Sequence, residues 1–184
     1  MEINNKIISE EFNWDNIAIG AAKYDSLMKM FNKVDVSKNE EFQKRFTGFY
    51  RVRRSKERFL QKYYSLMESL KNKETSYKEI INCLYTFEGK IEASFSSKLL
   101  ATLNPEMPIW DQYVLANAGI EAPKYYNVTI EMCVNKYEQL KSFYKSFLKT
   151  EKALNMIEEF NERLPEYQHF TDIKKIDLMF WQRR

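Results

Sequence analysis

Histidine, cysteine, glycine and proline are all scarce in this chain, and each shortage excludes a class of chemistry. The 184 residues include one His, two Cys, four Gly and four Pro. Two cysteines cannot form a disulfide scaffold or a CxxC zinc site, and a single histidine, His169, excludes zinc sites built on histidine pairs. The glycines are isolated, so they match neither a Walker loop nor a dinucleotide-binding loop. We therefore expect no metal site and no cofactor.

Long apolar runs and a strong excess of charge of one sign are also missing. No apolar stretch approaches the roughly 18 residues of a membrane-spanning helix, and no charged leader precedes an apolar segment at the amino end. We expect no membrane contact, a cytoplasmic protein, and buried, reduced thiols at Cys83 and Cys133. Twenty-nine basic against 26 acidic residues give a net charge of only +3, which does not by itself require a polyanionic partner.

Aromatic residues, by contrast, are abundant. The chain has 13 Phe, 12 Tyr and 3 Trp, and a chain with so many large apolar groups to bury is not expected to be disordered. Apolar residues recur at helical spacing, and short breaks separate the stretches. This pattern predicts an all-α protein, a single-domain helical bundle over residues 1–184 with about eight to ten helices. Residues 34–36 and 125–128 look extended but are too short to build a sheet.

Individual residues predict where helices begin and end. Gly119 is placed to end a helix in a left-handed conformation, and Gly89 is expected to stop another. Four polar residues precede apolar-periodic stretches and are predicted to open or cap helices: Ser37, Ser55, Ser76 and Asp111. For Asp111, which follows a proline-fixed turn, the alternative is a carboxylate presented to a cleft.

The charge is unevenly distributed along the chain. Residues 38–62 hold nine basic and three acidic residues, a local charge of +6. Arginine is concentrated there, and its planar guanidinium suits phosphate contacts and stacking on bases. DNA or RNA would then contact residues 44–62, with Tyr50 and Trp110 as stacking candidates; the alternative is a solvated face or internal ion pairs. The predicted nucleic-acid-binding residues are Arg45, Arg51, Arg53, Arg54, Lys56, Arg58 and Lys62.

Adjacent glutamates elsewhere in the chain point in different directions on a helix, so we expect them on solvent faces and not in a catalytic dyad.

The carboxyl-terminal stretch adds further charge. The terminal stretch adds four basic residues to the excess against two acidic ones: Lys174, Lys175, Arg183 and Arg184 against Asp172 and Asp177.

Residues 93–114 resemble part of the helix–hairpin–helix DNA glycosylase superfamily. In that superfamily a helix after the hairpin leads through a short turn into a motif whose aspartate is catalytic, and Ile-Trp-Asp-Gln-Tyr-Val at residues 109–114 looks like that turn. The resemblance to the glycosylases covers about residues 80–115. Most of the chain resembles a poorly characterised bacterial family related to this fold, and residues 48–54 and 174–182 are its other matching segments. The resemblance implies a helix–hairpin–helix glycosylase-like fold and a catalytic role for Asp111.

The chain departs from the glycosylase pattern where those enzymes hold DNA. Their hairpin holds a phosphate with the backbone amides of a glycine-rich turn, whereas residues 86–92 keep one glycine and carry Glu88 and Glu92. Residues 92–123 sum to −3, the wrong sign for a surface that holds phosphate. The iron–sulfur cysteines of some members are also absent.

The catalytic lysine of the bifunctional glycosylases is not matched either. Counting back from Asp111 by the family spacing lands near Ala93. Lys98 lies too close to Asp111 and Lys90 too far from it. The resemblance therefore implies a protein without lyase activity.

Three functions remain open at this point. The first is a nucleic-acid-associated binding protein on a degenerate glycosylase-like scaffold. The second is a protein-interaction factor from a bacterium or mobile element, such as an inhibitor of a nucleic-acid-processing system of the anti-CRISPR type. The third is a monofunctional base-excision glycosylase that uses Asp111.

Overall fold

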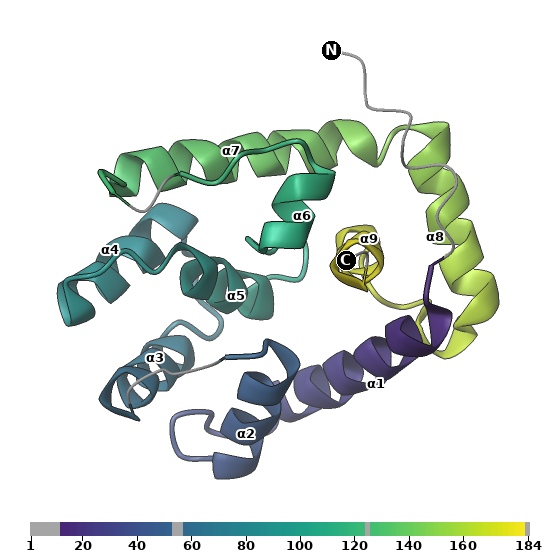
Figure 1. Cartoon of the computed structure of the whole chain (residues 1–184). Helices are drawn as coiled ribbons and strands as arrows, with labels where there is room; N and C mark the ends of the chain where they lie inside the picture. Colours follow the sequence, from purple (N-terminus) through teal and green to yellow (C-terminus); the bar gives the residue numbers. More distant parts are fainter. Residues whose placement is uncertain (1–11, 53–56, 124–125, 183–184) are drawn as a thin grey trace.

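A computed structural model describes residues 12–52, 57–123 and 126–182, and every regular element in these ranges is helical (Figure 1). This confirms the all-α prediction, and the extended-looking residues 34–36 form a loop. None of the described helices is long and apolar enough to cross a membrane. The elements in these ranges are α1 (Trp14–Phe31), α2 (Glu40–Phe49), α3 (Glu57–Ser69), α4 (Tyr77–Glu88), α5 (Ala93–Leu103), α6 (Gln112–Asn117), α7 (Ile130–Phe147), α8 (Glu151–Arg163), the 3₁₀ turn η2 (Pro165–Tyr167) and α9 (Asp172–Gln182).

Helix α9 lies at the centre of the molecule. Figure 1 shows it nearly end-on, with α1, α6, α7 and α8 around it. Every residue from Ile173 to Phe180 is buried, as expected of a helix enclosed on all sides. Lys174, Lys175 and Asp177, which were counted with the charge of the carboxyl-terminal stretch, are therefore buried and add no charge to the surface.

Aromatic side chains fill the space between α2 and α3. Phe42 and Phe46 of α2 lie against Tyr64 of α3 with ring centroids 6.2 and 5.7 Å away. Tilted and edge-on pairs of this kind add about 0.5–1.5 kcal/mol each beyond the burial of their area. The hydroxyl of the neighbouring Tyr63 donates to the backbone carbonyl of Phe95 at 3.0 Å. Tyrosine can therefore serve as a core residue here, because its polar end finds a partner inside the protein.

Local sequence signals determine several helix boundaries. Ser76 forms a capping box at the start of α4: its hydroxyl accepts from the Glu79 N–H, and the Glu79 carboxylate accepts from the Ser76 N–H. Gly89 and Gly119 have φ angles of 64° and 67° and follow α4 and α6. The predicted cap at Ser76 and the predicted ends at both glycines are confirmed.

The second helix begins later than predicted. Asn39 caps α2 through its side-chain oxygen, which accepts from a backbone N–H in the first turn at 2.8 Å. Ser37, the residue predicted to open this helix, instead donates its hydroxyl to the carboxylate of Asp35. Such a local hydrogen bond favours a turn over a helix. The other predicted cap, Ser55, lies outside the described residues.

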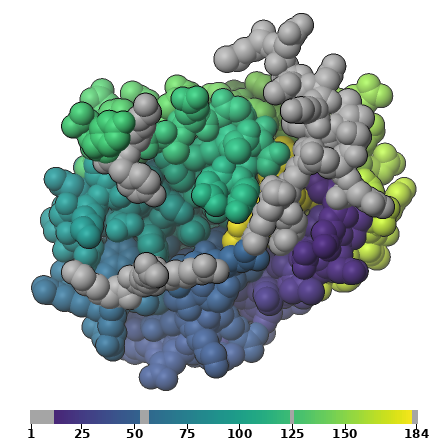
Figure 2. Space-filling model, viewed as in Figure 1, coloured from purple at the N-terminus to yellow at the C-terminus, as the bar shows by residue number. Residues whose placement is uncertain are grey.

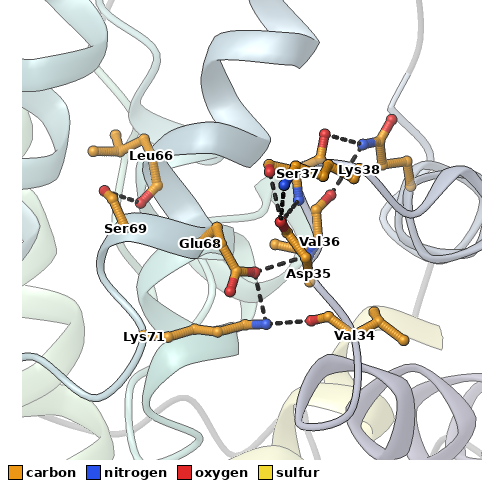
Figure 3. Close-up of polar contacts among 10 residues, drawn as sticks. Val34, Asp35, Val36, Ser37, Lys38, Leu66, Glu68, Ser69 and Lys71 are labelled. Carbon is orange, nitrogen blue, oxygen red and sulfur yellow. Dashed lines mark hydrogen bonds and ion pairs between the residues drawn. The ribbon is translucent and has the colours of Figure 1, made fainter.

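Two charged side chains fasten the loop between α1 and α2 (Figure 3). Glu68 of α3 accepts from the Val36 N–H at 2.8 Å, and Lys71 Nζ donates to the Val34 carbonyl at 2.6 Å. Glu68 and Lys71 also pair with each other at 2.7 Å. Charge-assisted hydrogen bonds of this kind are stronger than neutral ones. They hold the loop that sets α2 beside α1.

The two cysteines have different surroundings. Both thiols are free; Cys133 of α7 is buried, whereas Cys83 of α4 is exposed. The prediction of burial is wrong for Cys83, because the buried face of α4 is formed by other residues: Tyr77, Ile80, Ile81 and Leu84.

Candidate functional site

The predicted basic stretch divides into side chains with different surroundings. Arg45 and Arg51 line surface pockets beside α1. Arg58 is exposed in the first turn of α3, whereas Lys62 is half-buried with its Nζ 5.2 Å from the ring centroid of Phe87 in α4. The structure thus brings Arg45 and Arg51 to one surface and turns Lys62 toward another helix. Three predicted residues lie outside the described ranges: Arg53, Arg54 and Lys56.

Two adjoining surface pockets lie along α1 and α2, and together we call them the basic groove. Their volumes are about 530 and 440 Å³, and both are lined by Lys23, Gly48 and Phe49. Trp181 of α9 also lines the larger pocket. In the space-filling view, α9 (yellow) reaches the surface between the green of α6 and the blue and purple of the amino-terminal helices (Figure 2). The charged residues that line the groove are Lys23, Lys44, Arg45, Arg51 and Glu41.

Arg45 connects α2 to α1 at one end of the groove. Its Nε donates to Glu41 at 2.7 Å, and its Nη1 donates to the hydroxyl of Ser26. The hydrogen bond from Arg45 holds the pKa of the Glu41 carboxyl below its ordinary value. Because Glu41 offsets Arg45, the positive charge of the groove comes mainly from its other three basic residues.

The two aromatic residues predicted to stack on a nucleobase are covered by protein. Tyr50 is 2% exposed with its ring 4.6 Å from that of Phe46, and Trp110 is 8% exposed and parallel to Tyr77 at 6.4 Å. Two aromatic residues line the groove: Phe49, which is buried, and Trp181, which is half-buried. Stacking by Tyr50 or Trp110 would require a conformation different from the one described.

Behind Trp181 lies a small cavity, which we call the charged chamber because four of the residues that line it carry charge. Its volume is about 10 Å³, enough for a single water molecule. Phe49 and Trp181 line both the chamber and the groove, so these two rings separate them. The chamber is lined by four charged residues: Lys98 of α5, Asp111 at the start of α6, and Lys174 and Asp177 of α9.

Asp111 caps α6 and also lines the charged chamber. Its Oδ1 accepts from the Tyr113 N–H at 2.9 Å, which confirms the predicted cap. Burial lowers the pKa of the nearby Lys98, and the negative charge of Asp111 opposes that shift. Lys98 Nζ also donates to the Tyr50 carbonyl at 3.4 Å. Lys98 therefore connects the chamber to the end of α2, and the catalytic role of Asp111 stays a prediction.

Lys174 and Asp177 form an ion pair in the interior. They are 1% and 2% exposed, and Lys174 Nζ lies 3.5 Å from Asp177 Oδ2. Burial raises the pKa of Asp177 and lowers that of Lys174, while the attraction between the two opposes both shifts. The Tyr144 hydroxyl donates to the other carboxylate oxygen. Among the described residues, Lys174 Nζ and Asp177 Oδ2 have no hydrogen-bond partner beyond their own long contact.

The turn between α4 and α5 is acidic. Burial raises the pKa of Glu92, and the neighbouring charge of Glu88 raises it further. Glu92 precedes α5 without a capping hydrogen bond from its side chain. Two carboxylates at this turn disfavour a phosphate there, so the candidate interface is the basic groove and not the α4–α5 turn.

Sequence reasoning did not select Lys23, Lys98, Lys174 or Asp177 as site residues. Lys23 lies in α1, away from the basic stretch, and no local signal brings it beside α2. For the last two a signal was available, because charged residues interrupt an otherwise apolar helix. In the part of the chain that the structure describes, no group of three or more His, Cys, Asp or Glu is placed to hold a metal ion.

Comparison with known proteins found no family model, curated protein or solved structure that matches this chain. The groove and the chamber are therefore interpreted from their own geometry and chemistry.

Proposed function

We propose that this protein binds nucleic acid through the basic groove. The observation that carries the proposal is the convergence of Lys23 from α1 with Lys44, Arg45 and Arg51 from α2 and its carboxyl-terminal end on one hollow surface. A groove lined mainly by positive charge attracts a polyanion over a distance. The release of counterions from the phosphate backbone then adds affinity.

The order of features from α4 to α6 supports a scaffold that resembles the helix–hairpin–helix glycosylases. Helix α4, the left-handed Gly89, helix α5 and the aspartate that caps α6 follow one another in the order that the resemblance implies. By the family spacing, the lysine position of the bifunctional enzymes would fall near Ala93, where this chain has no lysine. We therefore propose a binding protein without lyase activity.

Fluorescence anisotropy with short labelled single-stranded DNA, duplex DNA and RNA tests this function. The wild-type protein should bind at least one of the three, with an affinity that falls steeply as salt rises. Lys23→Ala and Lys44→Ala should each weaken binding, and each should reduce the slope of log affinity against log salt by about 1.

Lys145→Ala is the matched control for these variants. Lys145 is an exposed lysine in the last turn of α7, and α7 lies across the ring of helices from α1 and α2 (Figure 1). This variant should bind as the wild type does. An equal loss in Lys145→Ala would contradict a localised groove. No binding of any oligonucleotide at low salt would contradict the function itself and favour a protein partner.

A second candidate function is base excision by Asp111. One observation favours it: the Asp111 carboxylate lines a chamber that shares Phe49 and Trp181 with the groove. In that role the carboxylate would stabilise positive charge on the sugar or activate water. Asp111→Asn keeps an oxygen that can cap α6 but removes the charge. Base release from damaged duplexes that disappears in Asp111→Asn would support this function, and release that persists would contradict it.

A further inference from the structure

Arg51 has an unusual backbone conformation. Five described residues have positive φ angles; two are glycine, two are the asparagines Asn72 and Asn127, and the fifth is Arg51 with φ 50°. Glycine adopts this region without steric penalty, and asparagine is enriched there. Arginine has neither advantage, so its presence at this position requires a compensating interaction or a function.

The backbone at this position ends α2 and requires a left-handed residue whatever its side chain. The Val52 N–H donates to the Thr47 carbonyl at 2.9 Å, which is the hydrogen bond of a helix that ends in a left-handed residue. Arg51 occupies the place where glycine is most frequent. The fold thus explains the conformation but not the arginine.

The conformation brings the Arg51 guanidinium to the basic groove. Its central carbon lies 5.8 Å from the ring centroid of Trp181, and both residues line the larger pocket. From the other side, Lys98 Nζ donates to the carbonyl of Tyr50, the residue before Arg51. A guanidinium that lies over an indole has restricted freedom, while the N–H groups along its edge still face outward to form paired hydrogen bonds.

We propose that Arg51 is the residue that anchors a phosphodiester group of the bound nucleic acid, and that the chain keeps it in a strained conformation for this purpose. The inference rests on the proposed nucleic-acid function. Two phosphate oxygens match the two parallel N–H donors of a guanidinium. The Trp181 ring beneath the guanidinium limits its orientations at the groove, so Arg51 contributes a restricted geometry in addition to its charge. Strained backbone is concentrated at binding sites of this kind.

Three variants test the proposal. Arg51→Gly relieves the backbone and removes the anchor, so it should raise the melting temperature by about 2–4 °C and weaken oligonucleotide binding about tenfold or more. Arg51→Lys keeps the charge and the strain but loses the two parallel N–H donors of the guanidinium. Its melting temperature should stay near that of the wild type, while its binding should fall almost as much as in Arg51→Gly. Asn72→Gly is the control: it changes another left-handed position and should leave binding unchanged.

The outcomes separate this inference from the function on which it rests. Wild-type binding that Arg51→Gly leaves unaffected would overturn the anchoring role alone. A lower melting temperature in Arg51→Gly would overturn the claim of strain. If Arg51→Lys binds as tightly as the wild type, charge suffices and the fixed geometry is wrong. Absence of wild-type binding to any oligonucleotide would refute the proposed function and this inference with it.

Discussion

Removing one member of the buried Lys174–Asp177 pair should destabilise the protein far more than removing both. The two side chains are 1% and 2% exposed and face each other at 3.5 Å. In Asp177→Asn the ammonium of Lys174 either stays charged without its partner or releases its proton. Releasing it at pH 7 costs about 5 kcal/mol, at about 1.4 kcal/mol for each unit below the ordinary pKa of 10.5. This value is an upper bound, and breaking a buried pair typically costs about 3–5 kcal/mol.

The loss of stability should depend on pH in opposite directions in the two single variants. Burial lowers the pKa of Lys174, and in Asp177→Asn the attraction to Asp177 no longer opposes that shift, so the folded protein releases this proton at a lower pH than the unfolded chain does. The loss of stability should therefore shrink as pH rises from about 7 to 9, by up to about 1.4 kcal/mol per unit. Lys174→Met leaves Asp177, whose folded pKa is raised by burial. In that variant the loss should shrink as pH falls from about 7 to 5, because protonation neutralises the remaining charge.

Urea unfolding at three pH values, followed by circular dichroism, measures these differences. The double variant Lys174→Met/Asp177→Leu removes both charges and should stay within about 2 kcal/mol of the wild type. Glu138→Gln is the control, since it breaks an exposed ion pair with Lys141 and should cost less than about 1 kcal/mol. Losses below about 1 kcal/mol in both single variants, or slopes with the same sign, would refute this reasoning.

Three further predictions concern local contacts. Glu68→Ala should lower the free energy of unfolding by about 2 kcal/mol, because it removes a charged partner from the Val36 N–H and from Lys71; an equal loss in Ser65→Ala, on the exposed face of the same helix, would contradict this. The melting temperature should fall as pH drops below about 4.5, because hydrogen bonds from Ser76 lower the folded pKa of Glu79 below its ordinary value. Stability from this source is present above that value and lost on protonation, so a Glu79→Gln variant should show a flatter melting profile. Asp111→Ala should cost about 1 kcal/mol through loss of the α6 cap, whereas Asp111→Asn should cost little; equal costs in thermal melts would argue against the cap.

The shared wall between the groove and the chamber matters for both candidate functions. Phe49 and Trp181 separate a surface lined by basic residues from a cavity that contains Asp111 and Lys98. A ligand in the groove therefore lies one aromatic layer away from Asp111. For the second candidate function, a base would have to pass this layer to reach Asp111.

Features that depend only on neighbouring residues can be read from the amino-acid sequence. Ser76, Asp111 and Gly89 mark helix boundaries because a cap involves atoms only a few residues apart. The recurrence of apolar residues determined the all-α class for the same reason, since helical periodicity is local. The excess of arginine near Arg51 was likewise visible as a count along the chain.

Which of these charges share a surface depends on how the helices pack against one another. Lys23 and Arg51 line the same pocket because α2 lies beside α1. The loop between these helices is held by Glu68 of α3 and by Lys71, which follows α3. Lys174, which the sequence places in a charged carboxyl-terminal stretch, is interior because α1, α6, α7 and α8 lie around the buried part of α9 (Figure 1). Periodicity shows which face of a helix is apolar but not how many neighbours will cover it. Burial and charge pairing arise from contacts between segments that are distant in the sequence, so they cannot be predicted from local sequence patterns.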